Sequence, residues 1–203
     1  MNLSKSQYQR LQVKGAELFK DLKHEVELGQ GKWVIEFVVM MQAYFRKIIN
    51  MQEAGLKDEI AYISLSLLRT KMLSGEYQIR LDAYHQGWYL DRIECSGIYE
   101  VGHFYGRLDE FMKLLVKMRQ ETFVNLTFGE INEHFFRESQ YYFFTVSEFI
   151  RTALKEAVKT EEFQKIKRAP VFCIHFGEFQ DSLAIVYKED HTTLPMSSEE
   201  VEV

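Results

Sequence analysis

The stretch from Trp33 to Phe45, WVIEFVVMMQAYF, constrains the fold of this 203-residue chain more than any other segment. It is apolar on nearly every side of a helix and is interrupted only by Glu36 and Gln42. A bilayer span needs roughly 20 consecutive apolar residues, so this run is too short to cross a membrane. A helix that is apolar on all sides is usually buried. We therefore expect a central helix over residues 32–53 that other elements surround.

Two further helical segments flank this central helix in the sequence. Apolar residues recur at helical spacing over 6–28, and Gly29 and Gly31 are expected to end that helix. The same spacing predicts a helix over 57–73, which follows the central one.

The second half of the chain returns to helical spacing after a stretch of different character. Apolar residues predict a helix over 101–123. Thr127 and Glu130 then form the pattern of a capping box, in which each side chain bonds the backbone of the other residue. This pattern starts a long helical region over 128–158, for which we expect a break near Thr145. The chain thus contains five or six helices.

Two segments alternate between apolar and polar residues, which is typical of strands. Residues 77–95 predict one β-hairpin, and residues 171–176 with 183–187 predict a second. Strands joined in hairpins form antiparallel sheets. We therefore predict an α+β fold, mostly helical, with five or six helices packed on one face of a small antiparallel sheet built from two β-hairpins.

The register of the first hairpin depends on the turn within RLDAYHQGWYLDR. A two-residue turn would place two aspartates opposite each other, and a three-residue turn would mix polar and apolar residues on both faces. A loop over 84–87 instead pairs Ala83 with Trp88 and Arg80 with Asp91, and it leaves one face almost wholly apolar. Because register follows the face that buries best, we expect this four-residue loop.

On this interpretation most residues of the hairpin have a structural role. Trp88 faces the core, and Gly87 takes a left-handed turn position. Tyr84, His85 and Tyr89 then lie at or near an aromatic, polar hairpin tip. We predict that this tip is available to contact a partner.

The charge is distributed unevenly along the chain. The net charge is −5, and residues 189–203 carry five acidic side chains and no basic one. Residues 1–188 therefore hold 25 acidic and 25 basic side chains. Since nucleic-acid binding needs a basic surface, we expect no nucleic-acid partner. We predict a single globular domain over 1–188 and a disordered acidic tail over 189–203.

Sequence features also bear on location. The first ten residues lack the apolar segment of a signal peptide. The chain has two cysteines, Cys95 and Cys173, which are too few for a disulfide framework. We therefore expect a soluble, cytoplasmic protein without membrane contact.

Two groups of residues have spacings that metal sites use. Glu100 and His103 form a Glu-x-x-His pattern, but ferritin-like di-iron proteins need two such motifs, and the second is missing. Glu130, His134 and Glu138 recur every four residues, which we interpret as a solvated ladder on one helix. The sequence therefore predicts neither a metal site nor a cofactor.

Glu36 is the most unusual single residue, because it interrupts the apolar central helix. A buried carboxylate is costly unless it is paired or protonated. Arg69, on the apolar side of the predicted 57–73 helix, could reach it across the core. Two interpretations stay open: a buried structural pair, or a functional carboxylate in a pocket.

The chain lacks the motifs of nucleophilic catalysis and of phosphate-binding loops, such as Gly-x-Ser-x-Gly. Our first hypothesis is a non-catalytic protein-binding or regulatory, inhibitor-like module that contacts a protein partner or a second copy of itself. The alternative is a metal-dependent or small-ligand-binding enzyme with a pocket among the aromatic helices, using Glu36, Arg69, Glu100 or His103.

Overall fold

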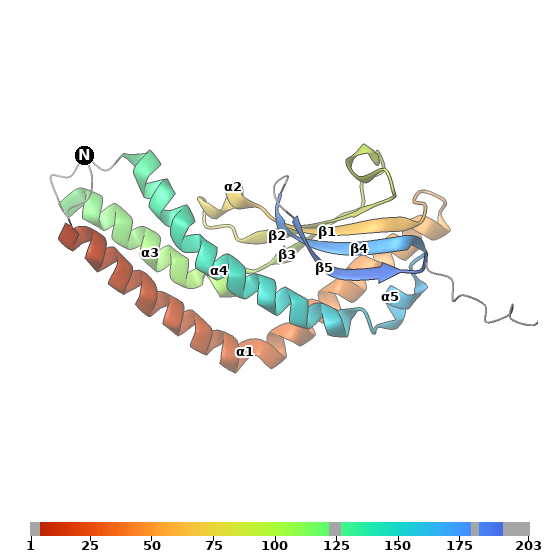
Figure 1. The fold of residues 1–203 in the computed structure, drawn as a ribbon, viewed down its shortest axis with the longest axis horizontal. Helices are drawn as coiled ribbons and strands as arrows, with labels where there is room; N and C mark the ends of the chain where they lie inside the picture. The colour runs from red at the N-terminus through yellow and green to blue at the C-terminus, as the bar shows by residue number, and fades with distance from the viewer. Residues whose placement is uncertain (1–4, 122–126, 180–182, 193–203) are drawn as a thin grey trace, which may run out of the picture.

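The computed structural model describes residues 5–121, 127–179 and 183–192 (Figure 1). Within these ranges the fold is α+β, as the sequence predicts. The helices are α1 (Lys5–Glu53), α2 (Arg69–Met72), α3 (Gly102–Glu121), α4 (Phe128–Ala157) and α5 (Glu161–Lys165). The strands are β1 (Ile60–Leu67), β2 (Gln78–Tyr84), β3 (Ser96–Glu100), β4 (Arg168–Glu178) and β5 (Leu183–Asp190), and η1 (Trp88–Leu90) is a short 3-10 helix.

The five strands form one sheet in the order β3-β2-β1-β4-β5. β1 pairs with β4 in parallel, whereas the other neighbours are antiparallel. The expected purely antiparallel sheet is therefore wrong, and the sheet is mixed. The reason is β1, which inserts between the two antiparallel pairs and lies parallel to a strand more than a hundred residues later.

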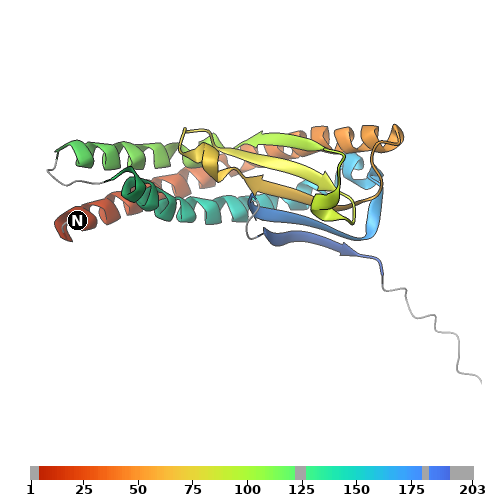
Figure 2. The same cartoon turned by 90° about the horizontal axis from the view of Figure 1, so that it is seen from above.

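Helices cover one face of this sheet. In Figure 1, α1 and α4 run beneath the sheet and continue past its end, and α3 joins them there. Figure 2 shows the same arrangement from above, with the sheet over one half of the molecule and the three helices extending from it. The loop that carries η1 rises from the opposite face of the sheet (Figure 1). Within the described ranges, one face of the sheet therefore lacks a helical layer, and we call it the open face.

The segment predicted as a helix over 57–73 contains β1 instead, and the helical part is limited to the four residues of α2. The run Ile63-Ser64-Leu65-Ser66-Leu67 alternates between apolar and polar residues, as a strand does. A helical stripe is also readable in this segment, so local sequence is ambiguous. Pairing with β2 on one side and β4 on the other provides hydrogen-bond partners for the backbone N–H and C=O groups of β1.

The two helices predicted over 6–28 and 32–53 are one continuous helix, α1. Gly29 and Gly31 lie inside it rather than at an end. A β-carbon at Gly29 would come within 2.7 Å of the Trp33 indole, so glycine here leaves room for that ring. Figure 1 shows α1 bending near its middle, where these glycines fall in the sequence. Glycine pairs are a common cause of such bends.

The later helices agree better with the sequence. α3 matches its predicted range closely. The capping box of α4 is confirmed: Thr127 Oγ1 accepts a hydrogen bond from the Glu130 backbone, and the Thr127 backbone donates to Glu130 Oε2 at 2.8 Å. The expected break near Thr145 is wrong. Thr145 Oγ1 instead donates to the Tyr141 carbonyl at 3.2 Å within the continuous helix.

The C-terminal hairpin of β4 and β5 is confirmed, with Phe176 opposite Ala184. β5 runs to Asp190, so it includes the first two residues of the predicted tail. Glu189 accepts a hydrogen bond from Arg168 at 2.8 Å, which ties this end of β5 to β4. Residues 193–203 lie outside the described residues.

Candidate functional site

The expected hairpin register over residues 77–95 is wrong. β2 pairs with β3 so that Asp82 lies opposite Ser96, and residues 85–95 form a long loop between the strands. Arg80 bonds Asp82 and Glu94, each at 2.8 Å, rather than Asp91. Local alternation favoured a short turn, whereas hydrogen bonds to groups outside the hairpin hold the longer loop.

One buried ion pair holds this loop in place. Lys57 Nζ lies 2.6 Å from Asp91 Oδ2, and both side chains are almost fully buried. Asp91 also accepts backbone hydrogen bonds from His85 at 2.9 Å and from Ile93 at 3.0 Å. Burial disfavours the carboxylate, but these hydrogen bonds and the charge of Lys57 keep the pKa of Asp91 below its usual range. The loop is therefore a fixed part of the fold.

The loop also contains a strained residue. Gly87 has φ −74° and not the expected left-handed conformation, whereas Trp88 has φ 52°. Positive φ is rare for a bulky residue and costs energy that the surroundings must supply. The strain places the Trp88 ring over the open face of the sheet, with ring centres 4.1 Å from Tyr62 and 4.8 Å from His175.

Beneath Trp88, three polar side chains lie in one row across the central strands. In the strand register Ser64 of β1 is opposite Asp82 of β2 on one side and His175 of β4 on the other. Each is less than a tenth exposed. Side chains at i and i+2 of a strand share a face, so Ser66 extends the polar surface by one position along β1. These residues form the polar row: Ser64, Ser66, Asp82 and His175.

The polar groups of this row are paired to different degrees. The Ser64 and Ser66 hydroxyls share a hydrogen bond of 2.8 Å. Asp82 binds the guanidinium of Arg80 with two parallel hydrogen bonds, at 2.8 and 2.9 Å. In contrast, Nδ1 of His175 is buried without a hydrogen-bond partner among the described residues. Burial lowers the pKa of His175, so the ring is neutral at pH 7.

The three residues predicted at the hairpin tip lie in or beside this loop. The Tyr84 ring stacks on Trp88 at 6.0 Å and meets Tyr89 edge-on at 5.5 Å. Burial raises the pKa of Tyr84 to about 12, so its hydroxyl stays protonated. His85 accepts a hydrogen bond from the Gly87 backbone at its Nδ1, at 2.7 Å. Tyr84 and Tyr89 thus form one aromatic cluster with Trp88 above the polar row, and His85 lies in the same loop.

Exposed apolar side chains lie on the same side of the sheet as this cluster. Ile98 is opposite Arg80, and Ile185 is opposite His175, so both lie on the open face. Phe179 lies beside the Arg80 guanidinium, at 5.8 Å. Together with two residues of η1 they form what we call the apolar rim, whose exposed fractions run from 38% to 82%: Tyr89, Leu90, Ile98, Phe179 and Ile185.

The geometry of the polar row does not suit nucleophilic catalysis. In a Ser-His-Asp triad the histidine lies between the other two and accepts the serine proton. Here Ser64 lies between Asp82 and His175, and its hydroxyl bonds Ser66. The arrangement instead holds buried hydrogen-bonding groups beneath an aromatic cover.

The expectation of a buried Glu36 paired with Arg69 is wrong. Glu36 is exposed and lies 3.6 Å from Lys32, one turn earlier on α1. Arg69 bonds Glu178 at 2.9 Å and stacks on the Phe136 ring. Glu36 faces outward because α1 turns its apolar side toward the sheet.

Glu36 does lie near another predicted residue, His103. The carboxylate acts electrostatically on both His103 and Tyr99, which belong to the junction of β3 and α3. His103 Nε2 and the Tyr99 hydroxyl are both buried without a hydrogen-bond partner in the described part of the chain. Burial lowers the pKa of His103, and the ring packs on Trp33 at 4.5 Å. We call Glu36, Tyr99 and His103 the junction cluster.

Glu100 does not join this cluster. It is exposed at the end of β3 and accepts a hydrogen bond from Gln78 at 2.7 Å. The Glu-x-x-His pattern does not lie within one helix, because Glu100 belongs to β3 and α3 begins at Gly102. No group of three potential metal ligands occurs among the described residues.

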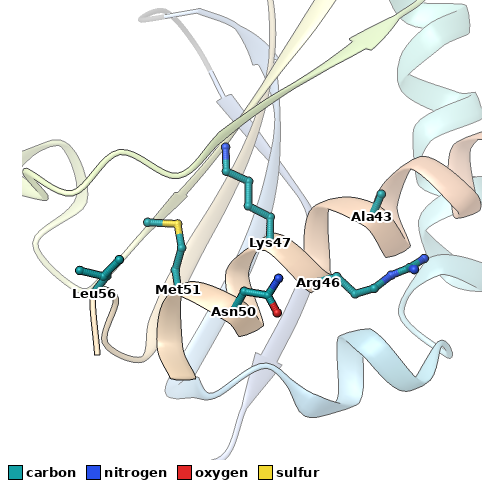
Figure 3. Close-up of a pocket in the computed structure, with 6 residues that line it drawn as sticks. All are labelled: Ala43, Arg46, Lys47, Asn50, Met51 and Leu56. Carbon is teal, nitrogen blue, oxygen red and sulfur yellow. The ribbon is translucent and has the colours of Figure 1, made fainter. Parts of the chain in front are cut away.

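A separate surface hollow with a volume of about 570 Å³ lies at the C-terminal end of α1. Figure 3 shows the side chains that line it. Lys47 reaches from α1 toward β3 and donates to the Ser96 carbonyl at 2.6 Å (Figure 3). Arg46 lies 3.6 Å from Glu162. Both cations are already paired within the chain, so we do not assign an anion site here. The hollow is lined by Ala43, Arg46, Lys47, Asn50, Met51 and Leu56.

Sequence reasoning missed Ser64, Ser66 and His175 as members of one site. The signal for the serines was the alternating run Ile63 to Leu67, which a helical interpretation concealed. No local signal links His175 to them, because the parallel pairing of β1 and β4 joins distant segments.

Comparisons with known proteins add no family to this description. No family model, curated protein or solved structure matches the chain. Among the described residues, no helix is both long enough and apolar enough to cross a membrane.

Proposed function

We propose that this protein is a non-catalytic binding module that recognises a protein partner through the open face of its sheet. The observation that carries this proposal is the apolar rim. The solvated face of a sheet is normally polar, whereas here five exposed apolar side chains lie on the open face, at its edge or on the loop above it. Exposed apolar surface bordered by polar groups is characteristic of protein interaction sites.

The polar row supports the same proposal. Interfaces combine apolar contact area with hydrogen bonds that fix the orientation of the partner. The Arg80 guanidinium, which binds Asp82 of this row and is one third exposed, is available for this purpose. A regulatory or inhibitor-like role and a cytoplasmic location are further parts of the proposal. Cell fractionation with an antibody to the chain tests the location.

The interaction is tested by comparing two charge substitutions. Leu90 of the apolar rim is 82% exposed, and Leu28 on α1 is 76% exposed, so Leu28→Asp is a matched control for Leu90→Asp. Tagged chains are purified from the native cells, and bound proteins are quantified. We expect one partner in a fixed ratio with the unaltered chain and with Leu28→Asp, and its loss with Leu90→Asp.

The same variants distinguish a second protein from a second copy. If the purified chain dimerises in sedimentation velocity and Leu90→Asp is monomeric, the partner is another copy. The proposal is contradicted if Leu90→Asp and Leu28→Asp associate equally with a partner. It is also contradicted if the unaltered chain neither retains a partner from the cells nor dimerises in sedimentation velocity.

A second candidate function, a small-ligand-binding enzyme, is favoured by the junction cluster. Two buried polar atoms without partners, next to a carboxylate, are unusual in a folded protein. Native mass spectrometry of the purified chain tests this candidate. A retained metal or small molecule that is lost in His103→Phe supports it, and a bare mass contradicts it.

A further inference from the structure

A cleft lies between α1 and α4 in the part of the bundle that extends beyond the sheet. It has a volume of about 310 Å³ and is lined by Gln12, Gly15, Ala16, Phe19, Glu138 and Tyr141. A neighbouring cavity of about 110 Å³ shares Gln12, Glu138 and Tyr141 with it. The Glu138 side chain therefore lies where the two cavities meet. This region is separate from the open face, and the inference drawn from it does not depend on the proposed function.

The position of Glu138 depends on a glycine in the opposite helix. A β-carbon at Gly15 would come within 2.6 Å of Glu138 Oε1 and 2.9 Å of Oε2. The carboxylate thus lies directly against the bare backbone of α1. The predicted solvated ladder is wrong for Glu138, which is half-buried at a helix interface.

In the described part of the chain this carboxylate has no compensating partner. No hydrogen bond or salt bridge to Glu138 occurs among the described residues, and the neighbouring Arg137 guanidinium bonds His134 instead. Burial raises the pKa of Glu138, and the positive charge of Arg137 only partly opposes this effect. An unpaired carboxylate in a cleft costs stability that a bound cation would restore.

Aromatic rings form another wall of the cleft. Phe19 and Tyr141 lie with their ring centres 5.5 Å apart, at an angle of 46°. The Lys23 ammonium group lies 4.8 Å from the centre of the Phe19 ring, so this ring already contacts one cation of the chain itself. Aromatic faces beside a carboxylate are the combination that binds ammonium groups in proteins.

We propose that the cleft binds a small organic cation, an amine or quaternary ammonium compound, with Glu138 as its counter-ion and Phe19 and Tyr141 as its aromatic walls. The volume suits a ligand at the small end of the usual range for binding pockets. Gly15 contributes by leaving space for the carboxylate.

The test is isothermal titration calorimetry of the full chain with choline and with agmatine, and with dimethylbutanol as the uncharged analogue of choline. We expect at least one of the two cations to bind and the uncharged analogue to bind more weakly. Glu138→Gln should lower the affinity roughly tenfold or more, since a charged partner is lost. Glu148→Gln, an exposed carboxylate on the same helix, is the matched control and should bind normally.

Gly15→Ala provides a second variant that keeps the carboxylate. Alanine favours the helix more than glycine does, so this variant should fold. Its added methyl group should displace Glu138 and weaken binding of the cation. Failure of both cations to bind, or equal affinity for the unaltered chain and Glu138→Gln, overturns the proposal.

Discussion

Replacing Lys57 by methionine tests whether a buried ion pair holds the loop above the open face. Methionine keeps most of the apolar length of lysine but removes the charge. The Lys57 and Asp91 side chains are 1% and 2% exposed, and their polar atoms lie 2.6 Å apart. The substitution therefore leaves a carboxylate buried without its cation.

The loss of stability in Lys57→Met can be estimated from the hydrogen bonds that Asp91 keeps. Removing one member of a buried pair costs about 3–5 kcal/mol. Asp91 retains its backbone hydrogen bonds from His85 and Ile93, so we expect about 3 kcal/mol, the lower end of that range. Because the pKa of Asp91 is lowered in the folded protein, the pair contributes stability above the unfolded pKa of about 4. The difference in the free energy of unfolding between the unaltered protein and Lys57→Met should therefore shrink as the pH falls below that value.

Urea unfolding followed by circular dichroism measures this difference at pH 7 and at low pH. In a Trp33→Phe background, fluorescence of Trp88 reports on the loop and should shift to longer wavelength in Lys57→Met. The double variant Lys57→Met, Asp91→Asn should recover part of the stability, because it removes the unpaired charge. A loss below about 1 kcal/mol, the value of an exposed pair, would refute the reasoning.

Substitutions at three other positions have definite expected results in unfolding experiments. His175→Phe removes a buried nitrogen without a partner, so stability at pH 7 should be unchanged or about 1 kcal/mol higher. Burial lowers the pKa of His175, so the unaltered protein should also lose more stability than His175→Phe as the pH falls below about 6.5. Thr127→Ala removes the capping hydrogen bond of α4 and should cost about 1 kcal/mol, whereas Thr127→Ser should cost less. Glu138→Gln should raise the melting temperature at pH 7, because the pKa of this carboxyl is raised in the folded protein, and the gain should vanish below about pH 4. If Glu138→Gln and the unaltered protein had the same melting temperature at pH 7 as well as below pH 4, the burial of Glu138 would be contradicted.

The elements that the sequence predicted correctly are those fixed by local interactions. The capping box needs only Thr127 and Glu130, and the β4–β5 hairpin joins neighbouring segments. β1 was missed because its strand character depends on pairing with β4, which follows more than a hundred residues later. α1 also continues through Gly29 despite the weak helical preference of glycine, and it packs against both α3 and α4.

The same distinction applies to the candidate site. Tyr84, His85 and Tyr89 are close in sequence, so a local interpretation grouped them even though their predicted register was wrong. The polar row beneath them brings together Ser64, Asp82 and His175 from three strands, and only the sheet topology places them side by side.

The most direct test of the central claim, that the open face is the interaction surface, is site-specific photo-crosslinking in the native cells. A photoreactive amino acid is placed in turn at Leu90 and Ile185 of the open face, and at Leu28 and Ile35 of α1, all of which are at least half exposed. We predict crosslinks to one protein from the first two positions and none to that protein from the other two. Crosslinks to the same protein from α1 alone, or none from the open face, would contradict the account.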